Sequence, residues 1–373
     1  MNGDFAMRLW CVSLLLVISF TAVSRDVAAK TWTVNPGQSI QAKIEGAAPG
    51  DTIQILPGVY NESITIAKDG LILIGLEYEG EYAVLNGKNE GGGLLETAVR
   101  VKAKNIRLEN LHIENYSKGG ITATSADGLH INGGRIARSG ESAITVKNSR
   151  SVHIERCIVR DATQAGISIE NAQEIRLVSL EVYSNRVGLV IADCLNVSIF
   201  DISVHHNSIG IILGAEKPEG DEGTNADHLS ITHSRIVGNG LKKDEIKIPT
   251  GLDVIPVIVG GVGIHIFGYD HVEIAHCYIE SNGTYGIMVG RSPGDDGKIL
   301  ASHTYIHHNR YDNNGTRPVE DFKDVYPEIP PGDIYWDGTG ERNQFQETGE
   351  LKTWPENLIV EQGGVHTEVI HFL

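Results

Sequence analysis

Residues 165–213 read AGISIENAQEIRLVSLEVYSNR, VGLVIADCLNVSIFDISVHHNS and IGIIL, and this stretch decides the fold. Each block of 22 residues opens with a Gly-apolar-x-apolar segment. Two more short apolar alternations follow before a polar turn. Alternation with a period of two is typical of a strand that buries one face. Each block therefore predicts three short strands joined by turns.

The same pattern recurs along most of the chain, mainly at steps of 22 or 23 residues. The paired apolar positions of the first strand are Val99/Val101, Ile121/Ala123, Ile144/Val146, Ile167/Ile169, Leu189/Ile191, Ile211/Leu213, Ile264/Ile266 and Ile287/Val289. Short strands at a fixed period cannot bury their faces alone and must stack on their neighbours. The sequence predicts an all-β protein, a right-handed, single-stranded parallel β-helix with three sheets and about ten coils.

The ends of the chain depart from the repeat. Arg8, an apolar run over residues 9–20 and a small-residue site ending at Ala29 predict a signal peptide over residues 1–29, with export to the periplasm or the medium. Residues 30–311 are expected to form the β-helix domain, with an N-terminal cap over 30–50 that includes a short helix over 39–48. Residues 312–373 are expected to form a C-terminal cap and an irregular tail.

Composition excludes several kinds of protein. The chain has 373 residues and a formal net charge of −17, which argues against nucleic acid as a partner. No later segment is apolar enough to predict insertion into a membrane. We also expect the protein to be a monomer. After cleavage three cysteines remain, Cys157, Cys194 and Cys277, and we interpret them as small buried residues rather than as a disulfide framework or a zinc site.

Two long insertions break the repeat. Ile211 and Leu229 are 18 residues apart, where other coils take seven or eight, and Leu229 and Ile264 are 35 apart, where 14 or 15 is usual. The strands at Ile211 and Ile264 should be neighbours, so both insertions would border the same sheet face and wall a groove.

Alternation also predicts the floor of that groove. One outward row is Arg100, Thr122, Thr145, Ser168, Val190, Ile212, His265 and Met288, and a second is Lys102, Thr124, Lys147, Glu170, Ala192, Gly214 and Phe267. From these rows we expect substrate contacts at Arg100, Lys102, Lys147, Ser168, Glu170, Ile212, Phe267 and Met288.

His265, Arg291 and Asp253 are the candidate catalytic residues. His265 lies in mid-strand between the two insertions, where an imidazole could act as a general base. A lyase or epimerase acting on uronic acids needs a base for the C5 proton and a cation to stabilise the anion that forms. The alternative is a histidine packed under a loop, with ordinary surface charges around it.

The sequence predicts no metal site. Two acidic loops could nevertheless bind Ca²⁺ through carboxylate oxygens. One contains Asp295-Asp296 and the other Glu219, Asp221 and Glu222, and acidic loops of this kind are also common without an ion. His205-His206-Asn207 and His307-His308-Asn309 are interpreted as equivalent repeat positions at the end of a third strand. Polar turns are expected at Asn115, Asn185, Asn207, Asn239, Asn282 and Asn309.

The N-terminal region carries a resemblance to a known group of proteins. GQSIQ (37–41), AAPGDTIQILPGVYNESITI (47–66), LILIG (71–75) and the later Gly-Ile-x-Ile coils resemble the pectate-lyase-like β-helix superfamily, including bacterial parallel β-helix repeat proteins and the periplasmic NosD family. The resemblance implies the fold over residues 31–310. It does not choose among lyases, epimerases, glycoside hydrolases and non-enzymatic members, and no catalytic residue carries over.

The sequence thus favours an exported carbohydrate-active protein. It would bind an extended polysaccharide, one that contains uronic acids, in a groove on the first sheet, and it could cleave the polymer by β-elimination or epimerise it. A non-catalytic binding or maturation protein of the NosD type, or a structural envelope protein, remains the alternative.

Overall fold

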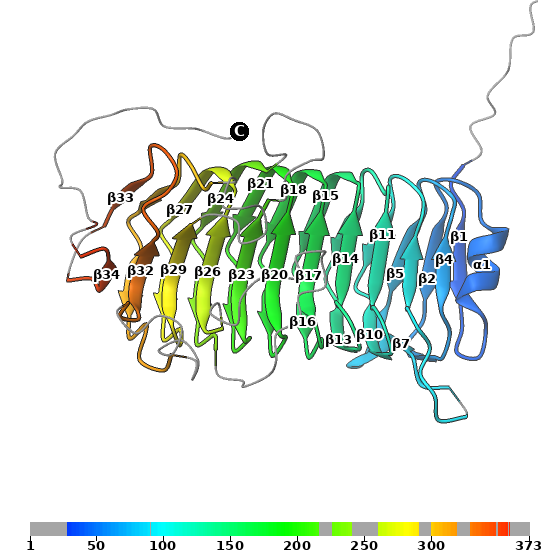
Figure 1. Ribbon diagram of the computed structural model, residues 1–373. Helices are drawn as coiled ribbons and strands as arrows, with labels where there is room; N and C mark the ends of the chain where they lie inside the picture. The colour runs from blue at the N-terminus through cyan, green and yellow to red at the C-terminus, as the bar shows by residue number, and fades with distance from the viewer. Residues whose placement is uncertain are drawn as a thin grey trace, which may run out of the picture.

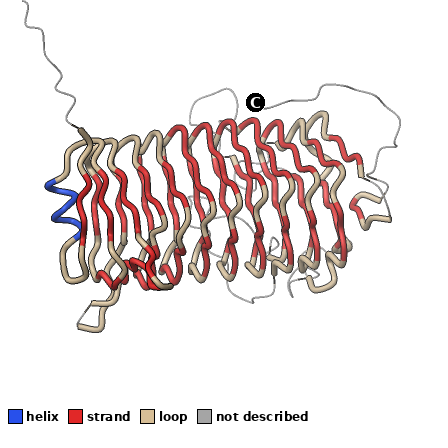
Figure 2. The backbone as a smooth tube through the Cα atoms, turned by 180° about the vertical axis from the view of Figure 1, so that it is seen from behind, coloured by secondary structure: helices blue, strands red, loops and turns tan. Residues whose placement is uncertain are grey.

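The computed structural model describes residues 28–89, 91–215, 226–240, 260–290, 300–318, 329–347, 350–356 and 358. They wind into a long parallel β-helix whose N-terminal coils and short helix lie at one end and whose strands β32–β34 lie at the other (Figure 1). Seen from behind, the strands of successive coils line up along the whole solenoid (Figure 2). The predicted fold class, an all-β parallel β-helix with three sheets, is confirmed.

Each coil gives one strand to each of three sheets, and every pairing between coils is parallel. The strands of the first sheet are β4 (Ile64–Ile66), β8 (Val99–Val101), β11 (Ile121–Thr124), β14 (Ile144–Lys147), β17 (Ala165–Glu170), β20 (Val187–Ala192), β23 (Ile209–Gly214), β26 (Val262–Phe267), β29 (Tyr285–Gly290), β32 (Gly332–Trp336) and β34 (Thr353–Trp354).

The second sheet follows the first within each coil. Its strands are β1 (Thr31–Val34), β2 (Thr52–Ile55), β5 (Ile72–Gly75), β9 (Arg107–Glu109), β12 (His130–Asn132), β15 (Arg150–Glu155), β18 (Gln173–Val178), β21 (Leu195–Phe200), β24 (Asp227–Thr232), β27 (Asp270–Ala275), β30 (Tyr305–His307) and β33 (Gln344–Gln346).

The third sheet forms the remaining side of each three-sided coil. Its strands are β3 (Gly58–Tyr60), β7 (Glu81–Asn86), β10 (His112–Tyr116), β13 (Arg135–Ser139), β16 (Ile158–Arg160), β19 (Glu181–Tyr183), β22 (Ser203–His205), β25 (Arg235–Val237), β28 (Tyr278–Glu280) and β31 (Arg310–Asp312). The short strand β6 (Glu77–Tyr78) pairs antiparallel with β7 at the side of this sheet.

One apolar core runs through the solenoid. The inward side chains of the three sheets, from Val34 near the N-terminus to Phe345, form a single buried cluster. Cys157, Cys194 and Cys277 are part of it, all as free thiols, and burial raises the pKa of each to about 12. Their interpretation as small buried residues is confirmed.

The N-terminal end is closed by helix α1 (Ile40–Gly46), which places Ile40 and Ile44 in the core. The Ser39 side chain accepts a hydrogen bond from the Ala42 N–H, and the Glu62 carboxylate accepts one from the Ile40 N–H at 2.6 Å. These two groups satisfy free N–H donors of the first turn.

At the other end the sheets extend past residue 311. Strands β32, β33 and β34 pair with earlier coils within the segment expected to be a cap and an irregular tail. Their sequences lack the Gly-Ile-x-Ile signature, so periodicity alone does not reveal them. The assignment of residues 1–29 as a signal peptide stays a prediction, since residues 1–27 lie outside the described part of the chain.

A ladder of buried asparagines stacks the turns between the third and first sheets. Asn185, Asn207, Asn239, Asn282 and Asn314 follow one another in successive coils. In each, the backbone N–H and side-chain amide donate to Oδ1 of the next asparagine at 2.9–3.2 Å, until Asn314 donates to Asp333. The fold therefore depends on a chain of buried amide hydrogen bonds parallel to its axis.

The structure corrects three expectations about the polar turns. Asn309 lies between the second and third sheets, where it donates to Glu347, while Asn314 holds the ladder position instead. His205 ends β22 of the third sheet but His307 ends β30 of the second, so the two His-His-Asn segments are not equivalent. Asn115 also lies elsewhere, within β10.

Glycines stand beside the ladder because there is no room for a side chain. A Cβ atom on Gly188 would lie 2.5 Å from the Gly210 carbonyl oxygen and 3.0 Å from the Asn207 amide nitrogen. This close approach explains the glycine that opens each Gly-apolar-x-apolar segment.

Replacing Asn207 by alanine should destabilise the protein strongly. Asn207 is fully buried and accepts from the backbone N–H of Asn185 at 2.9 Å, so the change leaves buried donors and acceptors unpaired. At about 1–3 kcal/mol for each unpaired group, we expect a loss of several kcal/mol, measured as a lower unfolding midpoint in urea. The control Asn35→Ala, at an exposed turn, should change the midpoint little, and equal midpoints for both variants would contradict a stabilising ladder.

Candidate functional site

The outer face of the first sheet has the predicted register. Arg100, Thr122, Thr145 and Ser168 are paired in sequence across β8, β11, β14 and β17. The row continues through Val190, Ile212, His265 and Met288, and it bridges the long insertion between β23 and β26. The second row pairs Lys147 with Glu170 and Gly214 with Phe267 in the same way.

The first half of this face is polar and accessible. Thr122 and Thr145 are half-buried, Thr124 and Lys102 are exposed, and Arg100 forms an ion pair with Glu96 at 3.3 Å. We call this surface, over β4, β8, β11, β14 and β17, the open strip.

A small network ends the open strip. Lys147 Nζ lies 2.6 Å from Glu170 Oε2, and the Ser168 hydroxyl donates to Glu170 Oε1 at 3.0 Å. Ser168 is buried, whereas the Lys147 and Glu170 side chains keep 43% and 20% of their surface exposed. The structure thus brings together three of the residues expected to contact substrate.

The second half of the face is closed. The outward side chains Val190, Ile212 and Phe267 are fully buried, and they form a second apolar cluster outside the coil core with Met288 and Tyr335 packed against it. The Phe267 ring lies directly over Gly214 of the preceding coil. Ile212 and Phe267 therefore present no surface to a ligand in this structure, although the sequence suggests that they line a groove floor.

His265 sits inside this closed half. Its side chain is 6% exposed, its ring lies 5.0 Å from that of Phe267, and its Nδ1 has no hydrogen-bond partner among the described residues. Burial lowers the pKa of His265 to about 4, with the negative charge of Asp337 acting in the opposite direction. The imidazole is therefore neutral at neutral pH.

The other catalytic candidates lie in segments outside the described residues. Arg291 and Asp253 lie outside the described residues, as do Asp295, Asp296, Glu219, Asp221 and Glu222 of the candidate Ca²⁺ loops. No catalytic set around His265 can be assembled from the described part of the chain.

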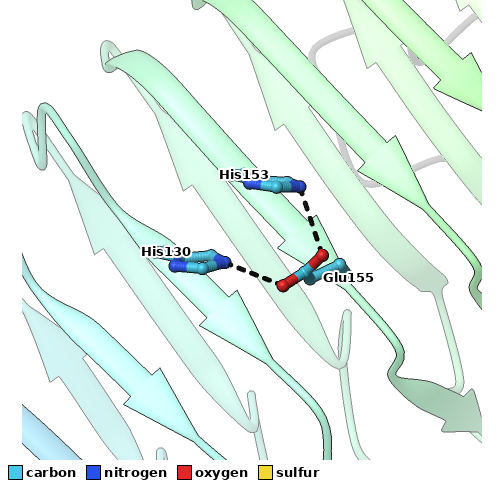
Figure 3. A group of neighbouring side chains, drawn as sticks. All are labelled: His130, His153 and Glu155. Atoms are coloured by element: carbon cyan, nitrogen blue, oxygen red, sulfur yellow. Dashed lines mark hydrogen bonds and ion pairs between the residues drawn. The ribbon is translucent and has the colours of Figure 1, made fainter.

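Groups able to hold a metal ion lie on the second sheet instead. Within the described residues they are His130 with His153 and Glu155, Asp227 with His228 and His271, and Asp270 with His271 and His303. Figure 3 shows the first group, in which two stacked imidazoles face one carboxylate.

Sequence reasoning overlooked the group at His130 and His153. The signal was present, because both histidines occupy the outward position between the two apolar residues of a second strand, Leu129/Ile131 and Val152/Ile154.

Comparisons with known proteins identify the fold. Residues 78–209 match a family model described as a right handed beta helix region. The protein XylC, solved in complex with xylose, is 9% identical with a TM-score of 0.55, over 76% of this chain and 70% of its own. No match to a curated protein is found.

Two further structures are similar. DFA-IIIase from Arthrobacter chlorophenolicus A6, in complex with GF2, is 12% identical with a TM-score of 0.54, over 84% of this chain and 94% of its own. The A-module of mannuronan C-5 epimerase AlgE4 from Azotobacter vinelandii is 14% identical with a TM-score of 0.51, over 83% and 92%.

The chain is a right-handed parallel β-helix protein, and the predicted resemblance is confirmed at the level of the fold. Identities this low carry no activity from one protein to another. Among the described residues, no helix has the length and apolar character required to cross a membrane.

The buried His265 should make the protein less stable in acid. The unfolded imidazole titrates near 6.5 and the folded one near 4, so between these values the unfolded chain binds the proton more tightly and stability falls as the pH falls. The full shift corresponds to about 3 kcal/mol. His265→Gln should therefore lose less stability than the wild type between pH 7 and pH 4, as measured by thermal unfolding.

The matched control is Met288→Leu, which changes the outward side chain paired with His265 in the next coil without removing a titratable group, and which should keep the wild-type dependence on pH. The same acid destabilisation in His265→Gln as in the wild type would contradict a neutral, buried His265.

Proposed function

We propose that the protein binds an extended, acidic polysaccharide along the open strip of the first sheet. The observation that carries this proposal is a row of hydroxyl and cationic side chains on an accessible face that ends where the face becomes closed. The polymer would cross the strands, following the axis of the solenoid.

The charge of the open strip favours an anionic polymer. Arg100, Lys102 and Lys147 project from this face of a chain with a net charge of −17. Arg100 and Lys147 form partly exposed ion pairs with Glu96 and Glu170, so a carboxylate of the polymer would share these two cations with them. Guanidinium and ammonium groups bind carboxylates through charge-assisted hydrogen bonds, so the carboxylates of uronic acids are suitable partners.

The hydroxyl groups of the strip complement a sugar. Thr65, Thr122 and Thr145 occupy the same row as Arg100 in successive coils. The coils repeat about every 4.8 Å, which is comparable with the length of one pyranose ring in an extended chain. A polymer of repeating sugars can therefore meet one coil after another in the same way.

The similar structures support a carbohydrate ligand without deciding which one. XylC is in complex with xylose, and the AlgE4 module is named a mannuronan C-5 epimerase. Export through the predicted signal peptide is part of the same proposal, because extended acidic polysaccharides occur outside the cytoplasm.

Removing the cations of the strip should weaken binding of an oligouronate. Arg100→Ala/Lys102→Ala/Lys147→Ala loses three charge-assisted contacts, each worth about 1.5–3 kcal/mol when fully formed, so we expect at least a ten-fold loss of affinity. Isothermal titration with oligogalacturonate and with oligomannuronate, each with and without Ca²⁺, measures this loss.

The control variant, Lys104→Ala/Arg107→Ala/Arg135→Ala, removes three cations that lie away from the open strip. Arg107 lies on β9 of the second sheet, Arg135 on β13 of the third sheet, and Lys104 in the turn before β9. It should bind like the wild type. Equal losses in the two triple variants, or binding of neutral oligosaccharides alone, would contradict the proposed surface.

Catalysis at His265 is a second candidate, favoured by the buried Nδ1 that lacks a partner among the described residues. A base with a pKa near 4 has little driving force to remove a carbon-bound proton, so binding is the stronger proposal. The ultraviolet absorbance of an unsaturated product reports β-elimination. If the wild type forms this product and His265→Gln does not, the protein is a lyase rather than a binding protein. Binding without turnover favours a non-catalytic protein of the NosD type.

A further inference from the structure

The second sheet carries histidines for two different reasons. His228, His271 and His303 stack in successive coils, and their φ angles are 58°, 47° and 51°. Histidine, like asparagine and aspartate, is enriched at such left-handed positions. The sharp turns of the coil therefore account for these three residues without a ligand.

His130 and His153 have no such explanation. They lie within β12 and β15, in register with each other, and their φ angles are not left-handed. Their rings stack with centroids 4.7 Å apart and planes 11° from parallel. Figure 3 shows both rings extending from neighbouring strands toward Glu155 of β15.

Of the two histidines, only His130 is within hydrogen-bond distance of Glu155. His130 Nε2 lies 3.3 Å from Glu155 Oε1, and His153 Nε2 lies 3.7 Å from Oε2. The turn histidines approach their carboxylates much more closely, since His271 Nδ1 is 2.9 Å from Asp227 and His303 Nδ1 is 2.8 Å from Asp270. These turn histidines are hydrogen-bonded to their carboxylates, whereas His153 lies beyond hydrogen-bond distance of Glu155, which is already bonded to His130 and Arg156.

One atom of this group is left without a partner. His153 Nε2 is closed to solvent and makes no hydrogen bond among the described residues. A buried polar atom without a partner costs about 1–3 kcal/mol. A bound group that takes the lone pair of this nitrogen would remove that cost.

We propose that His130, His153 and Glu155 bind a divalent transition-metal ion of the Zn²⁺ type. Imidazole nitrogen and carboxylate oxygen are the ligand types this ion prefers, at about 2.0–2.2 Å. Tetrahedral ligands at that range are separated by about 3.3–3.6 Å. The two nitrogen–oxygen distances here, one to each oxygen of Glu155, are 3.3 and 3.7 Å. All three ligand atoms lie within 4.8 Å of one another, so binding would draw the two Nε2 atoms together.

The group lies near the surface of the second sheet. The side chains of His130, His153 and Glu155 keep 24%, 35% and 15% of their surface exposed, although His153 Nε2 itself is covered.

Three nearby arginines lower the affinity of this group for a cation. Arg156 Nη2 lies 2.9 Å from Glu155 Oε1, and Arg107 and Arg176 flank the histidine pair in the coils before and after. These charges weaken binding of a cation. Arg156 competes for an oxygen that the ion would use, and its removal should strengthen binding.

The test is titration of tag-free protein with ZnCl₂ by calorimetry, followed by Co²⁺ substitution, since Co²⁺ absorption reports tetrahedral coordination. We expect one strong site in the wild type and a rise in the unfolding temperature with Zn²⁺. His153→Gln and Glu155→Gln should each bind at least ten-fold more weakly, because even the loss of an outer-shell partner costs 10–100-fold. Arg156→Gln should bind more tightly.

The matched control is His271→Asn, which removes the ligand shared by the two turn groups and keeps a residue that tolerates the left-handed conformation. It should retain the wild-type affinity. Wild-type affinity in His153→Gln and Glu155→Gln, or a loss of binding in His271→Asn alone, would overturn the proposal. Far-ultraviolet circular dichroism and the unfolding temperature without metal show whether each variant is folded.

Discussion

Parallel, in-register pairing between coils is the constraint on which the structure depends. Each paired strand residue stands above its equivalent in the coil before it, so the strand positions form columns along the solenoid. Columns of Ile and Val fill the core, and the column of Asn185, Asn207, Asn239, Asn282 and Asn314 links the turns through buried amides. A group that suits one coil recurs in the next because the geometry recurs.

The candidate functional surfaces lie where the polarity or the exposure of the side chains changes along a column. On the first sheet the outward column is polar from Arg100 to Ser168, and it is buried from Val190 to His265, with His265 as the polar residue in that part. That change separates a strip able to contact a polymer from a closed region containing His265. On the second sheet two equivalent outward positions hold histidine, and one carboxylate lies close to both.

Periodicity in the sequence was sufficient for the fold and for the register of the regular coils, although it did not reveal β32, β33 and β34. It placed His265 beside Ile212 across a gap of 53 residues, because each strand keeps its own alternating signature. It could not show that Ile212 is buried, since alternation gives the side of the sheet and not what packs upon it. Asn309 was assigned to the wrong turn because spacing alone does not separate the two turns of an irregular coil.

The central claim is that the open strip of the first sheet binds an acidic polysaccharide. A crystal structure of the protein with a bound oligouronate tests it most directly. The account predicts sugar rings lying along the row from Arg100 to Ser168, with carboxylates at Arg100, Lys102 or Lys147 and hydroxyls at Thr122 and Thr145. An oligosaccharide bound to the second or third sheet, with the open strip empty, would contradict it.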